Sequence, residues 1–314
     1  MTIPIEGVPL PAQREWIETL VSCGYTDLWS SEASTSDAFT PLALASVWAP
    51  QARLGSAIVP AFTRGPATLA MCVGTIADAA PGRVVFGMGT SSDVIVQRWN
   101  DIPFEKPYAR MRDTVRFLRS ALTGEKVVAE YETFSVDGFR LGRVPKIQPK
   151  IMLAALREGM LRLAGREADG AILNWLSADD VKKVAPYVHA GGPDKEIVAR
   201  LFVCPLDDPK RARQIGRRAI AAYLNVPVYA AFHAWVGREA VLADMWELWR
   251  VGKRNEALEA IPDAVVDELV VHGAPDACRA HIQRYVDAGV HTPVIQTLGH
   301  TPDPLQTARD LAPR

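Results

Sequence analysis

Small and polar residues follow several apolar stretches of this sequence, in positions where they could carry chemistry. Glu32 comes shortly after one such stretch, and its carboxylate could accept a proton or orient a ring N–H. An ion pair with an arginine would explain Glu32 equally well. Gly89, Thr90 and Ser91 lie in a glycine-rich turn after another stretch. The backbone of such a turn can approach a planar ligand closely, although a plain tight turn has the same composition.

A third position of this kind follows residues 150–155, where Gly159 lies near the start of an expected helix. The free N–H groups and partial positive charge of a helix N-terminus can hold a phosphate diester. Arg157 could add a charge-assisted hydrogen bond, although a solvated arginine is commoner at such a position. Trp175 directly follows Asn174 at the end of another apolar stretch. It is either a pocket wall or a packing residue.

The sequence lacks the common motifs of metal and nucleophile chemistry. Its six histidines include no His-x-His and no His-Glu-x-x-His, and its four cysteines include no Cys-x-x-Cys. The nucleophile motif Gly-x-Ser-x-Gly does not occur either. We therefore expect no metal, and we expect an organic cofactor to carry the chemistry while the protein supplies position and electrostatics.

The charge balance argues against nucleic acid as a partner. The 314 residues include 35 basic and 36 acidic side chains, spread along the chain without a basic stripe. The first residues show no basic region followed by an apolar run, and no stretch reaches the uncharged length of a membrane span. The composition predicts a cytoplasmic protein that acts on a small-molecule substrate and binds neither nucleic acid nor a membrane.

Short apolar runs alternate with longer segments of helical periodicity, which predicts a parallel sheet with crossover helices. Eight runs are candidate strands: residues 3–8, 26–30, 54–59, 84–88, 150–155, 171–174, 197–203 and 293–297. Eight is the number that a closed (β/α)₈ TIM barrel needs, and such barrels keep their chemistry at the carboxyl ends of the strands. A doubly wound sheet is the alternative, but no Gly-x-Gly-x-x-Gly turn follows the first run.

The segments between these runs carry helical apolar stripes. We expect helices around residues 16–21 and over 42–48, 67–79, 108–122, 159–168, 178–189, 210–224 and 275–288. Two insertions interrupt the rhythm: residues 124–143, which look like a hairpin, and residues 226–262, which look like extra helices. Because no low-complexity linker separates these parts, we predict a single domain over residues 1–314. We expect the second insertion to roof the substrate pocket.

The order of four segments resembles the bacterial luciferase-like family, specifically its branch of oxidoreductases that use the deazaflavin coenzyme F420. The segments are GYTDLWSSE at 24–32, LGSAIVPAFTRGP at 54–66, PGRVVFGMGT at 81–90 and MLRLAGREADG at 160–170. No single segment is diagnostic, but the resemblance runs over nearly the whole chain. It implies the same barrel that the eight apolar runs predict.

The resemblance also implies a cofactor site. Members of the family commonly have a non-proline cis peptide that bulges behind the deazaflavin ring, and here it would join Ala57 to Ile58. Glu32 aligns with an acidic residue that contacts the cofactor. The implied positions beside the ring are Pro60, Thr90 and Ser91, those along the phosphate-bearing tail are Leu156, Arg157, Gly159 and Met160, and Gly89 and Asn174 complete the expected site.

Departures from the family's sugar-phosphate dehydrogenase narrow the expected substrate. Ala33 stands where that enzyme has its catalytic histidine, and Ser92 replaces its general-base glutamate. Its cationic phosphate-binding residues are also not found here. The resemblance therefore implies hydride transfer between F420 and an uncharged small organic substrate. Glu32 and Asp37 are the candidate catalytic residues, and a proton could come from Asp37, Tyr108, Glu105 or water.

Two other functions stay open on the sequence. An FMN-dependent luciferase-like monooxygenase would have the same barrel with FMN in place of F420. A barrel that binds its cofactor without catalysing a reaction is the other alternative, because fold alone does not establish function. Family members are often dimers, so the resemblance implies a homodimer.

Overall fold

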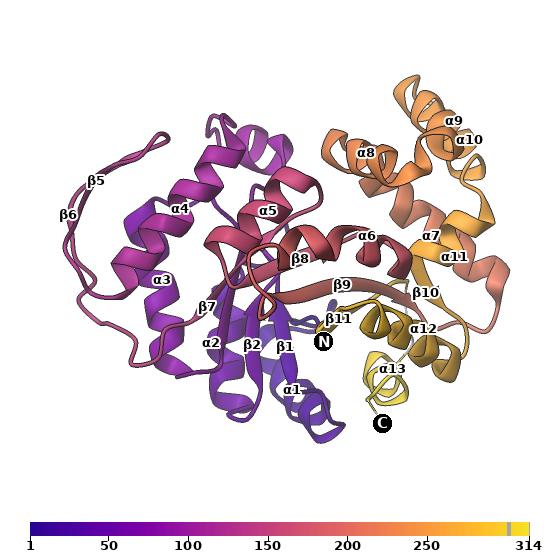
Figure 1. Cartoon of the computed structure of the whole chain (residues 1–314). Coiled ribbons are helices and arrows are strands. Elements are labelled where there is room, and N and C mark those ends of the chain that lie inside the picture. The colour runs from indigo at the N-terminus through magenta and orange to yellow at the C-terminus, as the bar shows by residue number, and fades with distance from the viewer. Residues whose placement is uncertain (300–302, 314) are drawn as a thin grey trace.

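The computed structural model describes residues 1–299 and 303–313. A curved, mostly parallel sheet lies at the centre, and helices cover its outer face (Figure 1). Its strands are β1 (Asp27–Ser30), β2 (Arg53–Ser56), β3 (Val59–Pro60), β4 (Val84–Gly89), β7 (Lys150–Ala154), β8 (Gly170–Asn174), β9 (Glu196–Cys204), β10 (Val270–His272) and β11 (Thr292–Thr297). The main covering helices are α1 (Gln13–Ser22), α2 (Phe39–Trp48), α3 (Pro66–Ala79), α4 (Pro107–Leu122), α5 (Glu158–Glu167), α6 (Ala178–His189), α7 (Pro209–Leu224), α12 (Pro275–Asp287) and α13 (Pro304–Asp310).

The strands close into a barrel through the N-terminal residues. Parallel pairing runs in the order β1-β2-β4-β7-β8-β9, and β11 pairs with the other side of β9. The amide of Thr2 donates to the carbonyl of Ile295 at 2.9 Å, and the amide of Ile3 donates to the carbonyl of Trp29 at 2.8 Å. The N-terminal segment thus bridges β11 and β1 as the eighth position. This arrangement confirms the predicted (β/α)₈ TIM barrel.

Six of the eight predicted strands agree with the structure to within one residue at each end. The first, residues 3–8, is wrong: only residues 1–3 pair with their neighbours, because Pro4 has no N–H to donate and the chain then turns. The third, residues 54–59, is divided into β2 and β3, and the cis bond Ala57–Ile58 lies between them. The three-residue strand β10 is too short to show a period in the sequence.

Both predicted insertions are confirmed. Residues 124–143 contain the hairpin of β5 (Val127–Glu130) and β6 (Ser135–Phe139), at the left of Figure 1 outside α3 and α4. The second contains α8 (Pro227–His233), η3 (Ala234–Arg238), α9 (Glu239–Arg250) and α10 (Arg254–Glu259), and α11 (Asp263–Leu269) follows it. Within the described residues no single helix is long and apolar enough to cross a membrane, and α7 with the α8–α9 segment reaches that length only as a pair bent by 110°.

Side chains inside the barrel form three layers, as alternation along parallel strands requires. The middle layer is apolar and consists of Trp29, Val85, Met152, Ile172, Val198 and Val294. β2 contributes Gly55 at this level, and the Trp29 ring occupies the space in front of it. A Cβ on Gly55 would lie 2.2 Å from Cε3 of Trp29. On each strand, the inward residue two positions before the middle layer belongs to a lower layer. The inward residues after the middle layer, towards the carboxyl end of the strand, belong to an upper layer.

The lower layer is a charged network centred on Arg53 of β2. Its guanidinium pairs with Asp27 of β1 and with Glu196 of β9, where Nη2 lies 2.7 Å from Oε1. It also donates to Oγ1 of Thr292 on β11 at 2.7 Å, and Nζ of Lys150 on β7 lies 2.9 Å from Glu196. Side chains from five strands therefore meet across the floor of the barrel.

This network predicts a specific loss of stability in acid. Burial tends to raise the pKa of Glu196, but hydrogen bonds from Arg53 and Lys150 lower it to about 2. A lowered carboxyl pKa stabilises the fold above the unfolded value of about 4.5, and this contribution disappears as the pH falls towards 2. We expect Glu196→Gln to lower the free energy of unfolding by about 3 kcal/mol at pH 7, and the difference from wild type to shrink between pH 4.5 and 2.

Urea unfolding at a series of pH values measures this effect. Glu259→Gln is the matched control, because Glu259 is exposed and should leave the pH dependence unchanged. If the free energy of unfolding of Glu196→Gln falls as steeply with decreasing pH as that of the wild type, the network does not have this role.

A second prediction concerns the close packing of β4 against β2. A Cβ on Gly87 would lie 2.1 Å from the carbonyl oxygen of Ser56 and 2.2 Å from Cδ1 of Ile172. Backbone cannot yield as a flexible side chain can, so Gly87→Ala should cost roughly 1–3 kcal/mol of stability in thermal or urea unfolding. Gly142→Ala is the control, since nothing lies within 4 Å of its added methyl group. Equal stability of the two variants would show that this packing can relax.

Candidate functional site

The upper layer at the carboxyl ends of the strands has two different halves. One half, which we call the small half, has Gly87 and Gly89 of β4 and Ala154 of β7 around the apolar side chain of Ile58, which follows β2. The other half is polar, with Asn174 of β8, Arg200 of β9 and Gln296 of β11. In a barrel of this kind, ligands bind at this end of the strands. The upper layer is therefore the candidate site.

The small half is built around the cis peptide Ala57–Ile58, which confirms the bond that the family resemblance implied. The Ile58 carbonyl accepts a hydrogen bond from the Glu32 amide at 3.1 Å, which joins the bulge to the end of β1. A Cβ on Gly89 would lie 3.0 Å from Cγ1 of Ile58 and 3.1 Å from Cβ of Ala154. Any side chain at position 89 would therefore force its neighbours apart, and glycine avoids this.

The turn after β4 continues this surface. Pro60 is buried at the end of β3, next to Gly89 in the parallel pairing. Ser91 has φ +62°, a left-handed conformation that non-glycine residues seldom adopt. Its carbonyl accepts a hydrogen bond from the Thr90 hydroxyl at 3.3 Å. Pro60, Gly89, Thr90 and Ser91 thus lie together, and the family resemblance had implied one site for them.

The Glu32 carboxylate is occupied by Arg64. Nη1 and Nη2 of Arg64 donate to its two oxygens at 2.6 and 2.8 Å, and the amide of Ala38 donates at 3.2 Å. The hydrogen bond with Glu32 raises the pKa of Arg64 above its ordinary value. Of the two interpretations that the sequence left open, the structure contains the ion pair. The pair fastens the end of β1 to the loop before α3.

Asp37 lies two residues before helix α2, and its carboxyl group caps the first amides of that helix. Its Oδ1 accepts hydrogen bonds from the amides of Phe39 and Thr40, each at 2.8 Å. Burial tends to raise the pKa of Asp37, but the hydrogen bonds from Thr40 and Phe39 and the charge of Arg64 together lower it. The carboxyl group is therefore held in its ionised form.

The amino end of α5 lies next to the end of β7. Arg157 precedes the helix in an extended conformation and is exposed, and its carbonyl accepts the first helical hydrogen bond from Leu161 at 3.0 Å. The amides of residues 158–160 precede that bond and have no partner inside the helix. Gly159 is exposed, whereas Leu156 and Met160 pack partly against the core. This end of α5 can present N–H groups to an anion.

The polar half contains Asn174, which the sequence analysis expected in the site, and Tyr229, Arg200 and Gln296, which it missed. Nδ2 of Asn174 donates to the hydroxyl of Tyr229 in α8 at 3.0 Å, and Nη2 of Arg200 donates to Oε1 of Gln296 at 2.7 Å. Arg200 stands in the apolar run 197–203. A lone charge inside a buried strand was the signal that could have revealed it.

Trp175 packs in a second core beside the site. Its ring stacks on Phe202 with centroids 4.0 Å apart, and Tyr223 lies at 5.1 Å. The side chain is only 1% exposed, and φ is +52°, which places it in the left-handed region. Trp175 is thus a packing residue at the edge of the upper layer. The other proposed proton donors, Glu105 and Tyr108, are exposed side chains on and before α4.

The second insertion is fastened over the end of β8. Besides the contact of Tyr229 with Asn174, Arg238 of η3 pairs with Asp180 of α6 at 2.7 Å and with Glu268 of α11 at 2.7 Å. Asp180 is 1% exposed and also caps α6 through Ser177. The insertion therefore lies over the polar half of the upper layer, where we expected a roof.

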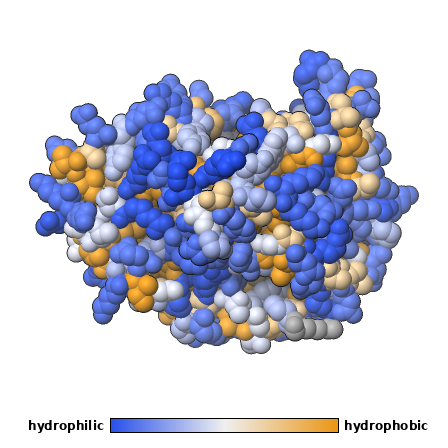
Figure 2. Space-filling view, viewed as in Figure 1, coloured by the Kyte–Doolittle hydropathy of each residue, from blue (hydrophilic) through white to orange (hydrophobic). Residues whose placement is uncertain are grey.

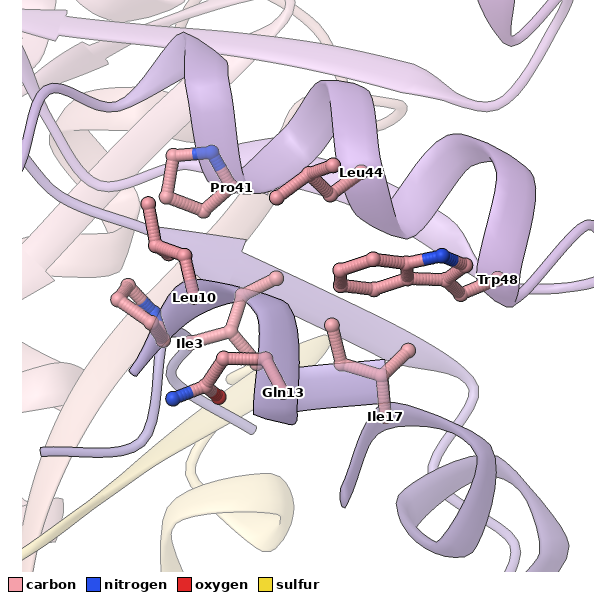
Figure 3. Close-up of a pocket in the computed structure, with 8 residues that line it drawn as sticks. Ile3, Leu10, Gln13, Ile17, Pro41, Leu44 and Trp48 are labelled. Atoms are coloured by element: carbon pink, nitrogen blue, oxygen red, sulfur yellow. The ribbon is translucent and has the colours of Figure 1, made fainter. Parts of the chain in front are cut away.

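Two surface depressions lie away from this layer. The crevice between α1 and α2, lined by Ile3, Ile17 and Trp48 among others, leaves no space for a water molecule (Figure 3). A groove of about 480 Å³ lies on the second insertion beside Trp246 and Trp249. Figure 2 shows hydrophobic side chains scattered among hydrophilic ones on the viewed face. Within residues 1–299 and 303–313 no group of three or more His, Cys, Asp or Glu side chains is arranged to hold a metal ion.

Comparison with known proteins agrees with this architecture. The family model described as luciferase-like monooxygenase matches residues 3–292. A Mycobacterium tuberculosis protein named as a coenzyme F420-dependent oxidoreductase is 27% identical over 97% of this chain and 94% of its own length. The 5,10-methylenetetrahydromethanopterin reductase of Methanolobus tindarius is 24% identical over 92% of each chain.

A solved structure shares the fold. The coenzyme F420-dependent tetrahydromethanopterin reductase from Methanopyrus kandleri superposes with a TM-score of 0.78 over 99% of this chain and 96% of the other. The two sequences are 18% identical, so the superposition shows a shared fold.

The Arg238 contacts generate a prediction. Arg238→Met removes the nearer of the two cations beside the buried Asp180 carboxylate and leaves Lys183 at 3.6 Å, which should cost about 3 kcal/mol in urea unfolding. Amide hydrogen exchange over residues 227–238 should become faster, since the insertion loses its attachment. Arg250→Met on the same insertion is the control, because Arg250 is exposed and its ion pair is with Glu247 of the same helix. Unchanged exchange in the Arg238 variant would show that other contacts hold the insertion.

Proposed function

The chain belongs to the luciferase-like monooxygenase family, and we propose that it is an oxidoreductase that transfers a hydride between coenzyme F420 and a small organic substrate. The observation that carries the proposal is the division of the upper layer into two halves. One half is apolar around Ile58, Gly89 and Ala154, and the other is polar at Asn174 and Arg200. A flat ring and a polar substrate can share such a layer, each against the half that suits it. The relatives named for F420 support this choice of cofactor.

The residues of the small half fit a flat ring. The side chain of Ile58 lies against Gly89, and the absence of a side chain at position 89 keeps that surface low. We propose that Ala57, Ile58 and Gly89 lie behind the ring, with Thr90 and Ser91 at its edge. Pro60 holds the strand end on which they stand.

The amino end of α5 fits the phosphate-bearing tail. Its first amides lack helical partners, and Gly159 adds no side chain that would cover them. We propose that the backbone of Leu156, Gly159 and Met160 holds the phosphate, and that Arg157 adds a charge. The only acidic residue of the first turn, Glu158, is paired with Arg162 at 2.8 Å, which reduces its repulsion of an anion.

When bound, F420 supplies a ring carbon that gives or takes a hydride, and the protein supplies position and electrostatics. Glu32 and Asp37 are the candidate catalytic residues from the sequence. Because hydrogen bonds occupy both carboxylates, we propose that they are positioning residues. Glu32 holds Arg64 and the loop before α3, and Asp37 holds the start of α2. Both elements border the small half of the upper layer.

We also propose that residues 1–314 fold as one domain. The supporting observation is the attachment of the second insertion to α6 through Arg238 and to β8 through Tyr229.

Titration of the purified protein with F420 and with FMN tests the proposal. We expect F420 to bind with a micromolar or lower Kd and FMN to bind at least tenfold more weakly, measured by the change in cofactor fluorescence. Binding of FMN alone would favour the monooxygenase. Binding of F420 without turnover across a panel of alcohols, enones and carboxylic acids would favour a cofactor-binding protein without catalysis.

The Gly159→Glu variant separates tail binding from stability. An added carboxylate at the amino end of α5 should repel the phosphate and weaken F420 binding about tenfold. The same change should leave stability equal or higher, because a glutamate in the first helical turn is favourable and replaces a glycine. Gly142→Glu, where the position is open, should leave F420 affinity unchanged. Equal F420 affinity of both variants would exclude α5 from the cofactor site.

A further inference from the structure

Among residues 1–299 and 303–313, Arg200 of β9 has no charged partner inside the barrel. It points inward, because it lies two residues after Val198 of the middle layer. Nη2 donates to Gln296, but Nε is buried without a hydrogen-bond partner. Within the described part of the chain no carboxylate forms an ion pair with this guanidinium. The phenol groups of Tyr223 and Tyr229 also lie near this guanidinium, and its Cζ atom lies 5.5 Å from the centroid of the Phe202 ring.

The contrast with other arginines near the barrel is clear. Arg53, Arg64 and Arg238 each have a carboxylate oxygen within 2.7 Å. A cation that is removed from water without an anion costs free energy, and these three arginines avoid that cost. Burial lowers the pKa of Arg200, yet a guanidinium stays charged at neutral pH. What Arg200 lacks is an anion.

Asn174 supplies a second unsatisfied group at the same level. The parallel pairing of β8 with β9 sets Asn174 beside Arg200. Its Nδ2 donates to Tyr229, but its Oδ1 is buried without a partner. Buried polar atoms are rarely left unpaired, so two of them on adjacent strands indicate a ligand that completes their hydrogen bonds. Both face the small half, where we place the cofactor ring.

We propose that Arg200, held through Nη2 by Gln296, binds the carboxylate group of a small organic acid that is the substrate. Oδ1 of Asn174 then accepts a hydrogen bond from a hydroxyl or N–H group elsewhere on the same molecule. The N–H groups along one edge of a guanidinium match the two oxygens of a carboxylate, and a single cation balances its single charge. This inference rests on the proposed function and adds the substrate class. A carboxylate substrate differs from the uncharged substrate that the sequence analysis expected. The sequence alone does not reveal that Arg200 points into the barrel.

Calorimetric titration of the cofactor-free and F420-loaded protein with benzoate and trans-cinnamate, and with benzamide and cinnamamide, tests the proposal. We expect each acid to bind the wild type at least tenfold more tightly than its amide, and Arg200→Met to remove this preference. Arg200→Lys keeps the positive charge but loses the paired N–H groups of the guanidinium, so it should retain only part of the preference for acids. Without ligand, Arg200→Met should melt at an equal or higher temperature than the wild type, because an apolar side chain replaces an unpaired charge.

Arg250→Met, an exposed arginine on the second insertion, is the control and should keep the preference for acids. Equal binding of acids and amides by the wild type would overturn the proposal, and so would no binding of either acid at about 10 mM. A lower melting temperature of unliganded Arg200→Met would instead make Arg200 a structural residue. If Arg200→Met weakens F420 binding as much as acid binding, Arg200 belongs to the cofactor site. If the wild type does not bind F420, the proposed function is contradicted. A preference of the cofactor-free protein for acids would still support the carboxylate site, because that measurement does not involve F420.

Discussion

The closure of the barrel depends on the charged floor around Arg53. The two edges of the sheet pair through residues 1–3, and side chains that cross the interior hold the strands of opposite sides in place. Arg53 of β2 pairs with Glu196 of β9, on the far side of the barrel, and reaches Thr292 of β11. Such a network is stable because every charge has a partner and additional hydrogen bonds. With the floor fixed, the strand ends above it have fixed positions too.

The middle layer transmits that order to the site. The Trp29 ring fills the space in front of Gly55, and Arg53 lies 5.8 Å below the ring centroid. Close packing leaves little freedom for the residues one level higher. The upper layer can then be left incomplete, with a low surface at Gly89 and unpaired polar atoms at Asn174 and Arg200. Stability is concentrated at one end of the barrel and ligand binding at the other.

Sequence reasoning found the small half of the candidate site and missed most of the polar half. Gly89, Thr90 and Gly159 are visible in the sequence because they follow predicted strands, and barrels bind ligands at the carboxyl ends of their strands. The cis bond after Ala57 came from the family resemblance alone, since no local pattern encodes it. Arg200 was overlooked because its strand was read as a continuous apolar run. Whether such a residue faces the interior or the helices depends on the register of the whole barrel.

The sequence by itself determined the order of strands and helices, both insertions and the barrel class, because hydrophobic periodicity and turn residues are local properties. It did not determine that residues 1–3 close the barrel, since that contact joins segments far apart in the chain. Nor did it decide between an active carboxylate and an ion pair at Glu32, because the partner, Arg64, is identified only by distance. Only the tertiary structure decided which charges are paired and which, like Arg200, remain open to a ligand.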